Sequence, residues 1–276
     1  MNAMTQIRPR PLRVAIAGYG AVGHRVAQAL DDGLPGYELT AIAARDKPRA
    51  ARDVAGLRYP VPVVDIAELE GLADLVVEAA PAALLAEIAS PFLAAGKRAV
   101  VLSAGALLEQ EALVELARQH GGQIIVPSGA LLGLDAVAAA AQGEIHSVRL
   151  VTAKPVKGLL GAPYLERNGI DLTGIAGATR IFQGSARQAA LGFPANVNVA
   201  AALSLAGIGP DRTMVEIWAD PALTRNTHSI SVEADSARFS MSIEGVPSDN
   251  PKTGRITALS VIACLRKLSG PLRVGT

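Results

Sequence analysis

The stretch that most constrains the fold lies near the N-terminus. Residues Leu12 to Gly23 read Leu-Arg-Val-Ala-Ile-Ala-Gly-Tyr-Gly-Ala-Val-Gly. The apolar run Val14 to Ala17 has the length and residue types of a buried strand. From Ala21 to Leu30, apolar residues recur at helical spacing, so a helix begins inside the glycine-rich stretch. The pattern therefore predicts a strand, a tight glycine turn and a helix.

A Gly-x-Gly-x-x-Gly motif between a strand and a helix is typical of a dinucleotide-binding fold. Gly18 permits the tight turn, Gly20 lets the backbone approach a pyrophosphate, and Gly23 lets the helix pack closely on the strand. The helix start at Ala21 and Val22 offers free N–H groups and a positive dipole end to phosphates. We predict that these five residues bind NAD or NADP; the alternative is an ordinary glycine-rich turn.

The end of the second predicted strand, Tyr37 to Ala44, bears on the choice between the two cofactors. An acidic residue there binds the adenosine ribose hydroxyls, whereas a nearby arginine accommodates a 2′-phosphate. Arg45 and Asp46 follow the strand. Arg45 is compatible with NADP, and Asp46 stands about one position late for a clear NAD signature. We expect use of both cofactors; alternatively, the two residues form a solvated loop and a helix cap.

Strands and helices alternate regularly as far as residue 126. This alternation predicts a doubly wound, Rossmann-type parallel sheet, whose strand ends line the cofactor crevice. We therefore expect Glu78 and Ala80, which end one of these strands, near the nicotinamide. The predicted elements are helix Asp65–Leu72, strand Ala73–Ala80, helix Ala82–Ala95, strand Arg98–Leu102, helix Glu109–His120 and strand Gln123–Val126.

The alternation is lost after residue 128. Clustered strands predict a second, α+β domain with a mixed or antiparallel sheet. We assign residues 1–128, completed by a C-terminal helix within 250–276, to cofactor binding, and residues 129–249 to substrate binding and oligomerisation. Residues 162–177 are expected to be irregular. The predicted strands are Ile145–Thr152, Thr213–Ala219, His228–Ala234 and Ala237–Glu244, and the predicted helices are Leu134–Ala141, Ser185–Leu191, Ala195–Leu205 and Lys252–Leu268.

Composition excludes several classes of protein. Half of the 276 residues are hydrophobic, which indicates an ordered globular chain. A net charge of +1 and 3% aromatic residues give no support to nucleic-acid binding. No uncharged apolar stretch is long enough to span a membrane, and the single cysteine, Cys264, excludes an internal disulfide. We expect a soluble cytoplasmic protein without a metal site.

Four histidines compete for the acid/base role that hydride-transfer chemistry needs. His24, His120 and His146 stand where ordinary structural roles suffice. His228 follows a polar loop that leads into a strand of the second domain, which makes it the best candidate. Asn196 and Asn198, at the start of a predicted helix, either cap that helix or bind the cofactor carboxamide or a substrate carboxylate.

Taken together, five segments give the chain a clear resemblance to the L-aspartate dehydrogenase family. The resemblance covers essentially the whole sequence. The segments are Gly18–Gly23, Pro127–Ala130, Phe193–Ala201, Ala219–Pro221 with Arg225–His228, and Asn250–Thr253.

The resemblance implies NAD(P)-dependent, reversible deamination of L-aspartate to iminoaspartate, which gives oxaloacetate and ammonia. The same resemblance implies a role in NAD biosynthesis. It also implies that His228 is catalytic and that Ala130 and Asn196 contact the nucleotide. The family's Lys-Pro-Pro turn reads Lys154-Pro155-Val156 here. With that family's reaction in view, we expect Lys154, Asn198 and His228 to bind substrate, with the carboxylates held by Lys154 and the asparagine-bearing helix start.

Other assignments remain open. Homoserine dehydrogenase and dihydrodipicolinate reductase have the same architecture, which alone does not separate them from this family. A dinucleotide sensor without catalysis would need the glycine motif but no acid/base residue. An exposed sheet face in the second domain would make a homodimer or a higher homo-oligomer natural.

Overall fold

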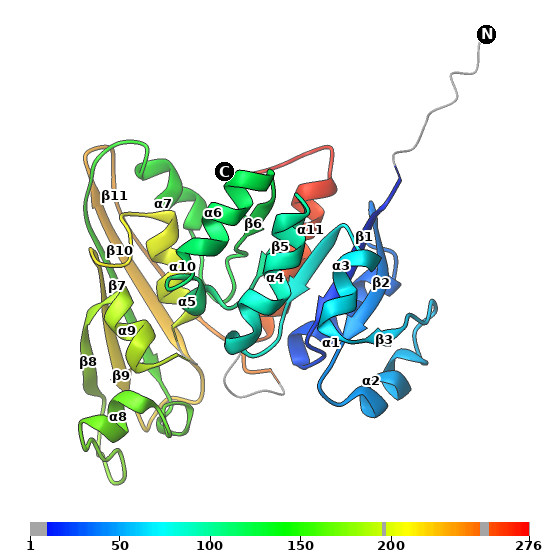
Figure 1. The fold of residues 1–276 in the computed structure, drawn as a ribbon. Coiled ribbons are helices and arrows are strands. Elements are labelled where there is room, and N and C mark those ends of the chain that lie inside the picture. The colour runs from blue at the N-terminus through cyan, green and yellow to red at the C-terminus, as the bar shows by residue number, and fades with distance from the viewer. Residues whose placement is uncertain (1–9, 195–196, 249–253, 276) are drawn as a thin grey trace.

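The protein is described here from a computed structural model, in which residues 10–194, 197–248 and 254–275 are placed. Two sheets stand side by side, each with its own helices (Figure 1). The first sheet is entirely parallel, in the order β3-β2-β1-β4-β5-β6, which confirms the predicted doubly wound sheet. Its strands are β1 (Leu12–Ala17), β2 (Tyr37–Ala43), β3 (Val63–Val64), β4 (Leu75–Glu78), β5 (Arg98–Val101) and β6 (Gln123–Ile125).

Helices cover both faces of this sheet. On one face, Phe92 and other residues of α3, α4 and α6 pack against alternate strand residues such as Val76. On the other face, α1 packs against residues such as Ile16 and Val77. Both faces are therefore buried, which explains why the strands are almost continuously apolar. The helices are α1 (Ala21–Asp31), α2 (Lys47–Val54), η1 (Ile66–Glu68), α3 (Leu69–Leu72), η2 (Ala82–Leu84), α4 (Leu85–Ala94), α5 (Ala104–Leu107) and α6 (Glu111–His120).

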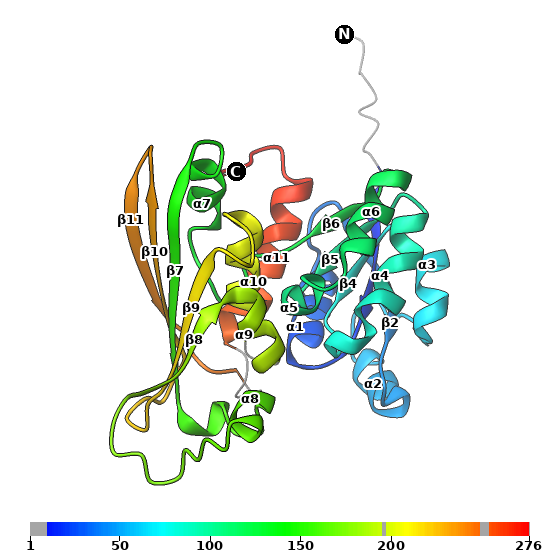
Figure 2. The same ribbon diagram turned by 60° about the vertical axis from the view of Figure 1, so that its left-hand side comes forward.

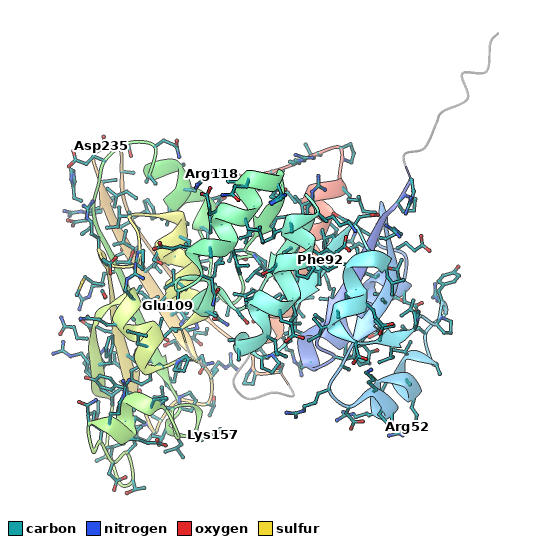
Figure 3. All side chains as sticks on the ribbon, in the orientation of Figure 1. Arg52, Phe92, Glu109, Arg118, Lys157 and Asp235 are labelled. Carbon is teal, nitrogen blue, oxygen red and sulfur yellow. The ribbon has the colours of Figure 1, made fainter. Side chains whose placement is uncertain are left out.

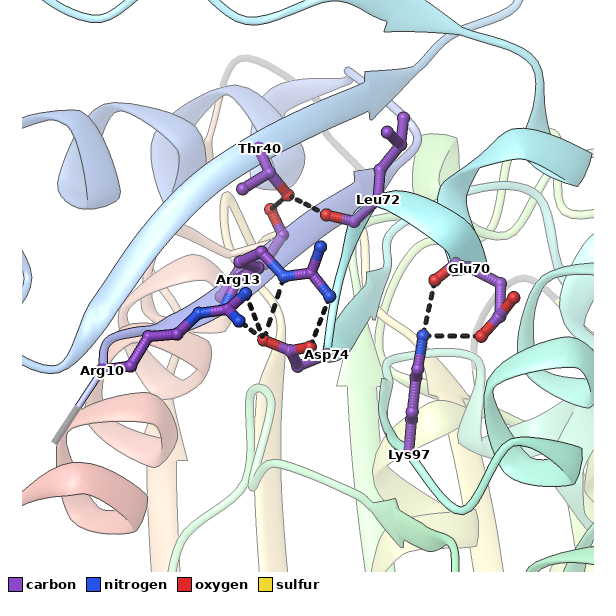
Figure 4. A network of polar contacts seen from close by, with 8 residues as sticks. Arg10, Arg13, Thr40, Glu70, Leu72, Asp74 and Lys97 are labelled. Carbon is purple, nitrogen blue, oxygen red and sulfur yellow. Dashed lines mark hydrogen bonds and ion pairs between the residues drawn. The ribbon is translucent and has the colours of Figure 1, made fainter.

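An ion pair fixes the beginning of the central strands. Asp74, just before β4, accepts hydrogen bonds from the backbone N–H and the guanidinium of Arg13 on β1 (Figure 4). Arg13 holds the pKa of the Asp74 carboxyl down to about 2. At the opposite end of β1, Ala17 pairs with Ala43 of β2 and with Glu78 of β4. The carboxyl ends of these strands are therefore level, and the loops after them meet in one place.

The second sheet is mixed, as predicted, in the order β11-β10-β7-β9-β8. Only β7 and β9 are parallel neighbours. Helices lie on one side of this sheet (Figure 2). The strands are β7 (Ile145–Lys154), β8 (Thr179–Ser185), β9 (Thr213–Ala219), β10 (Thr227–Ala234) and β11 (Arg238–Glu244). The helices are α7 (Leu134–Ala140), η3 (Val156–Gly158), α8 (Pro163–Arg167), α9 (Ala186–Gly192) and α10 (Asn198–Ala206).

Two elements of this part differ from the sequence prediction. Strand β8 was not predicted, because a register irregularity between Arg180 and Phe182 breaks the alternation of its buried and exposed residues. Residues 162–177 are not wholly irregular, since Pro163 begins the short helix α8. In the first part of the chain, the two-residue β3 was also missing from the prediction, and the short α2 was anticipated only through the alternative of a helix cap at Asp46.

The last helix, α11 (Arg255–Ser269), returns to the first sheet. Val261, Ile262 and Leu265 enter the core that α1 shares with β1 (Figure 1). The Tyr37 hydroxyl donates a buried hydrogen bond to the Leu265 carbonyl at 2.9 Å. The predicted start of this helix at Lys252 lies outside the described residues. No helix among the described residues is long and apolar enough to cross a membrane.

Candidate functional site

A cavity lies between the carboxyl-end loops of the first sheet and the second part of the chain. Its volume is about 300 Å³. Both sheets contribute to its wall, because the carboxyl-end loops of the first sheet open toward the ends of β7 and β10. The lining residues are Gly20, Ala21, Val22, Ala79, Ala80, Leu102, Ser103, Ala104, Val126, Pro127, Ser128, Gly129, Ala130, Lys154, Asn198, Val199, Ala202, Asn226, His228, Gly254 and Thr257.

The three motif glycines have different roles in this cavity. Gly18 has φ +99°, and a Cβ there would collide with the Ala79 carbonyl. A Cβ on Gly23 would collide with the Gly18 carbonyl, so both residues allow close backbone packing behind the cavity. Gly20 differs, because a Cβ there would meet no atom within 4 Å. Gly20 therefore presents bare backbone to the open space, as a closely approaching pyrophosphate requires.

Helix α1 begins at this point. Its N-cap residue is Gly20, no side chain caps it, and the first turn contains no acidic residue. The first N–H groups of α1 therefore remain available to an anion, and no carboxylate of that turn repels it. The glycine loop and the helix start fit the pyrophosphate of a dinucleotide, with Ala21 and Val22 lining the cavity beside it.

His228 lies on the opposite wall, at the beginning of β10. It is 4% exposed, and its Nδ1 atom lies 2.8 Å from the Thr152 hydroxyl on β7. Burial and the nearby charge of Lys154 lower the pKa of His228 from 6.5 to about 3. The imidazole is therefore neutral at physiological pH, with its other nitrogen, Nε2, free for chemistry.

Lys154 ends β7 and lines the same cavity. It is 4% exposed, and no carboxylate of the described residues forms an ion pair with its ammonium group. Burial lowers the pKa of Lys154 from 10.5 to about 8. At pH 7 it thus carries a buried, uncompensated positive charge, which favours binding of an anion in the cavity.

Glu78, which was expected near the nicotinamide, lies behind the wall of the cavity. Its side chain is fully buried, and it does not line the cavity. Instead the carboxylate accepts hydrogen bonds from the Leu102 N–H at 3.0 Å, and from the Ser103 N–H and hydroxyl, each at 2.9 Å. Burial raises the pKa of this carboxyl, although the hydrogen bonds oppose the shift. Glu78 therefore joins the loops after β4 and β5 from behind the cavity.

Of the two predicted asparagines, Asn198 is among the described residues. Asn198 does not cap α10; its side-chain oxygen accepts a 3.0 Å hydrogen bond from the Gly105 N–H of α5. This bond joins the two halves of the structure beside the cavity, where Asn198 also lines the wall. Asn196 lies outside the described residues.

The remaining predicted site residues lie in two groups. Ala80 and Ala130 line the cavity. Arg45 is exposed beyond the end of β2 and does not line it. Asp46 caps α2, with a carboxylate oxygen 3.0 Å from the Arg49 N–H, which bears out the helix-cap alternative for that residue.

The sequence analysis missed several cavity residues. Ser103, Asn226 and Thr257 line the wall, and Thr152 contacts His228 from behind it. Asn226 had one available signal, since it stands two residues before His228 in the same polar loop. Within the described part of the chain, no group of three His, Cys, Asp or Glu side chains is arranged to hold a metal ion.

Comparison with known proteins gives matches over both halves of the chain. Residues 135–268 match the family model "Aspartate dehydrogenase, C-terminal". Residues 18–127 match "Homoserine dehydrogenase, NAD binding domain", so the first half carries an NAD-binding domain. This second match is to a domain named after homoserine dehydrogenase, in keeping with the expectation that architecture alone does not separate homoserine dehydrogenase from aspartate dehydrogenase.

Whole-chain relatives agree with these matches. An L-aspartate dehydrogenase of Bradyrhizobium diazoefficiens is 58% identical over 96% of this chain and 94% of its own length. L-aspartate dehydrogenase 3 of Bordetella bronchiseptica is 55% identical, over 96% of this chain and 98% of its own. The crystal structure of an aspartate dehydrogenase from Thermotoga maritima has the same fold, with a TM-score of 0.72 at 24% identity; the match covers 96% of this chain and 99% of that one.

Proposed function

The chain belongs to the aspartate dehydrogenase family, and we propose that it catalyses the NAD(P)-dependent oxidative deamination of L-aspartate. The products are iminoaspartate and then, after addition of water, oxaloacetate and ammonia; the reverse amination uses the same site. One observation carries the proposal. The cavity brings the glycine loop of the NAD-binding half against two buried titratable side chains of the other half, His228 and Lys154.

The cofactor-binding residues of this proposal are the glycine loop, Arg45, Ala80, Ala130 and Asn196. The N–H groups at the start of α1 bind the pyrophosphate, and the loops after β4 and β6 border the nicotinamide half. When bound, the nicotinamide supplies the hydride acceptor for the substrate α-carbon. In this assignment residues 1–128 and 250–276 form the cofactor-binding domain, and residues 129–249 form the substrate-binding domain.

His228 moves protons at Nε2, because Thr152 occupies Nδ1. A neutral imidazole accepts a proton from the water that attacks the imine carbon, and returns a proton to the departing ammonia. The lowered pKa of His228 keeps the imidazole neutral before each turnover. Once protonated, Nε2 is a strong acid because of this low pKa, so it gives its proton readily to the amine nitrogen that leaves as ammonia.

Lys154 and Asn198 hold the substrate. The Lys154 ammonium binds a carboxylate of L-aspartate, which supplies the counter-charge that the cavity lacks. The amide of Asn198 lies at the start of α10, where it adds a polar contact to the substrate while its oxygen holds α5. The α-carbon of the substrate is thereby fixed between the nicotinamide side and His228.

We further propose a cytoplasmic homodimer or higher homo-oligomer. The helices described for the second part of the chain pack on one face of its five-stranded sheet. The other face carries exposed residues, among them Met214, and strand β11 lies at its edge. A second copy would cover such a face. Light scattering on the purified protein would give twice the chain mass or a higher multiple of it; a monomer at micromolar concentration would contradict this assembly.

The activity is tested with the purified protein, by following reduction of NAD and separately of NADP in the presence of L-aspartate. L-homoserine and D-aspartate are the matched control substrates. Turnover restricted to L-aspartate is expected. Turnover with L-homoserine instead would indicate a homoserine dehydrogenase. Tight cofactor binding without oxidation of any of these amino acids would favour a dinucleotide sensor.

A further inference from the structure

A second, smaller cavity adjoins the site. Its volume is about 60 Å³. Ala130, Asn226, His228 and Gly254 line both cavities, so the imidazole of His228 stands at the border between them. A water molecule needs about 10–15 Å³ by this kind of measure, so the side cavity has room for about four water-sized groups. This space suits a small polar group attached to a molecule in the main cavity.

The wall of the side cavity is positively charged. Lys157, on η3, and Arg225, in the loop before β10, both line it, and both are exposed. Neither makes an ion pair with any carboxylate of the described residues. No Asp or Glu is among the described residues that line this cavity, whereas Thr224 and Asn226 add polar groups. The charge and the polar groups together favour an anion with hydrogen-bond acceptors.

The two cavities provide cationic groups on both sides of His228. Lys154 is buried in the wall of the main cavity, and Arg225 lies in the wall of the side cavity. A substrate with two carboxylates has one on the reacting carbon and the other one methylene away. Such a molecule matches the arrangement if the reacting carbon lies beside His228.

We propose that the side cavity binds the distal carboxylate of a four-carbon dicarboxylate substrate, with Arg225 as its main anchor and Lys157 as a second cation. Lys154 holds the carboxylate on the reacting carbon. Arg225 is the better anchor of the two, because a guanidinium binds a carboxylate through two parallel hydrogen bonds. This assignment rests on the proposed function and names its specificity-determining residue. The limited volume selects against a longer chain.

The test compares Arg225→Gln, Arg225→Lys and Lys157→Gln with the unmodified protein. Arg118→Gln is the matched control, because Arg118 is exposed on α6 and, among the described residues, pairs only with Glu115 of the same helix. Figure 3 shows Arg118 toward the top of the view and Lys157 toward the bottom. Binding of succinate and of butyrate is measured by calorimetry on the full chain saturated with NAD. Both acids have four carbons, but only succinate has a distal carboxylate.

We expect Arg225→Gln to weaken succinate binding about 10- to 100-fold, the range for a hydrogen bond to a charged group, and to leave butyrate binding unchanged. Arg225→Lys should recover part of the loss, Lys157→Gln should have a smaller effect, and Arg118→Gln none. With L-aspartate, Arg225→Gln should raise KM by a similar factor with little change in kcat. Unchanged succinate binding in Arg225→Gln, or an equal loss for both acids, would overturn the proposal.

The result also separates this proposal from the proposed function. If the unmodified protein does not oxidise L-aspartate, the activity assignment fails, yet the succinate and butyrate affinities still decide what the side cavity binds. If L-aspartate is oxidised but Arg225→Gln keeps its KM, the activity stands and the side cavity is not the site of the distal carboxylate.

Discussion

The Nδ1 atom of His228 lies 2.8 Å from the hydroxyl oxygen of Thr152, its direct neighbour across the antiparallel β10–β7 pair. Both side chains are buried, at 4% and 2% exposure. A hydroxyl is a neutral partner, so it orients the imidazole without the rise in pKa that a carboxylate partner would cause. The ring is thus held in one orientation and remains uncharged, with Nε2 as its reactive atom.

Thr152 is therefore expected to position the imidazole. Thr152→Val preserves the shape of the side chain but removes the hydroxyl, and kcat should fall roughly 10-fold, in keeping with one lost hydrogen bond. Thr152→Ser keeps the hydroxyl and should recover most of the activity. Nitrogen NMR of His228 separates positioning from a packing defect, because its shifts should change in Thr152→Val only. Equal kcat and equal shifts in all three proteins would contradict this role.

The buried ammonium of Lys154 should reduce the stability of the fold, although it helps to bind the substrate. Its pKa is 10.5 when unfolded and about 8 when folded, so the unfolded state binds more protons between these values. The contribution of Lys154 to the free energy of unfolding is accordingly lowest below pH 8 and rises as the pH increases toward 10.5. Lys154→Met should raise the free energy of unfolding at pH 7 by about 2–3 kcal/mol and flatten this rise, as urea titrations at pH 7 and 10 would show.

The same substitution should impair catalysis. Without the buried ammonium, KM for L-aspartate should rise at least roughly 10-fold, the effect of a lost charged hydrogen bond. A Lys154→Met protein that is less stable at pH 7, or that keeps its KM, would contradict the description of Lys154 as an uncompensated cation that binds substrate.

Some of these features can be predicted from the sequence and others cannot. The strand, glycine turn and helix of residues 12–30 are readable because every signal in them is local. The contact between Thr152 and His228 is not, since the two are 76 residues apart and their pairing depends on the strand order of the second sheet. Strand β8 escaped prediction because its register irregularity hides the alternation.

Glu78 shows a different limit. Its place at the end of a parallel strand correctly indicates the edge of the sheet where the cavity lies. The direction of the side chain, however, is decided by the N–H groups and the hydroxyl of the loop after β5, which a buried carboxylate needs as partners. Those partners belong to another strand's loop, so the sequence alone does not reveal them.

Glu78 should accordingly govern the shape of the cofactor cavity. Glu78→Ala leaves the Ser103 N–H and hydroxyl without their acceptor, at a cost of about 1–3 kcal/mol for each donor that water does not reach. The Leu102 N–H loses its bond to the carboxylate and keeps only a longer one, 3.4 Å, to the Glu78 backbone carbonyl. Thermal unfolding should occur at a lower temperature, and NAD affinity should fall. Glu87→Ala is the matched control, because Glu87 is exposed on α4 and makes no ion pair with any of the described residues. Equal melting temperatures for both variants would contradict the proposed link between the loops.

Arg45 should affect NADP more than NAD. It is exposed and has no ion-pair partner among the described residues, so its guanidinium is available to a 2′-phosphate. Arg45→Ala should raise KM for NADP roughly 10-fold, in keeping with loss of a charged hydrogen bond, and change KM for NAD by less than about twofold. Parallel titrations of both cofactors at saturating L-aspartate measure this ratio, and equal changes would exclude Arg45 from cofactor discrimination.

The most direct test of the account is the kcat of His228→Ala with L-aspartate, measured beside its NAD affinity and melting temperature. If His228 moves the protons of the reaction, kcat should fall by roughly 10²–10⁴ while the protein remains folded and binds NAD normally. A folded His228→Ala protein that turns over L-aspartate within about threefold of the unmodified rate would remove His228 from the mechanism.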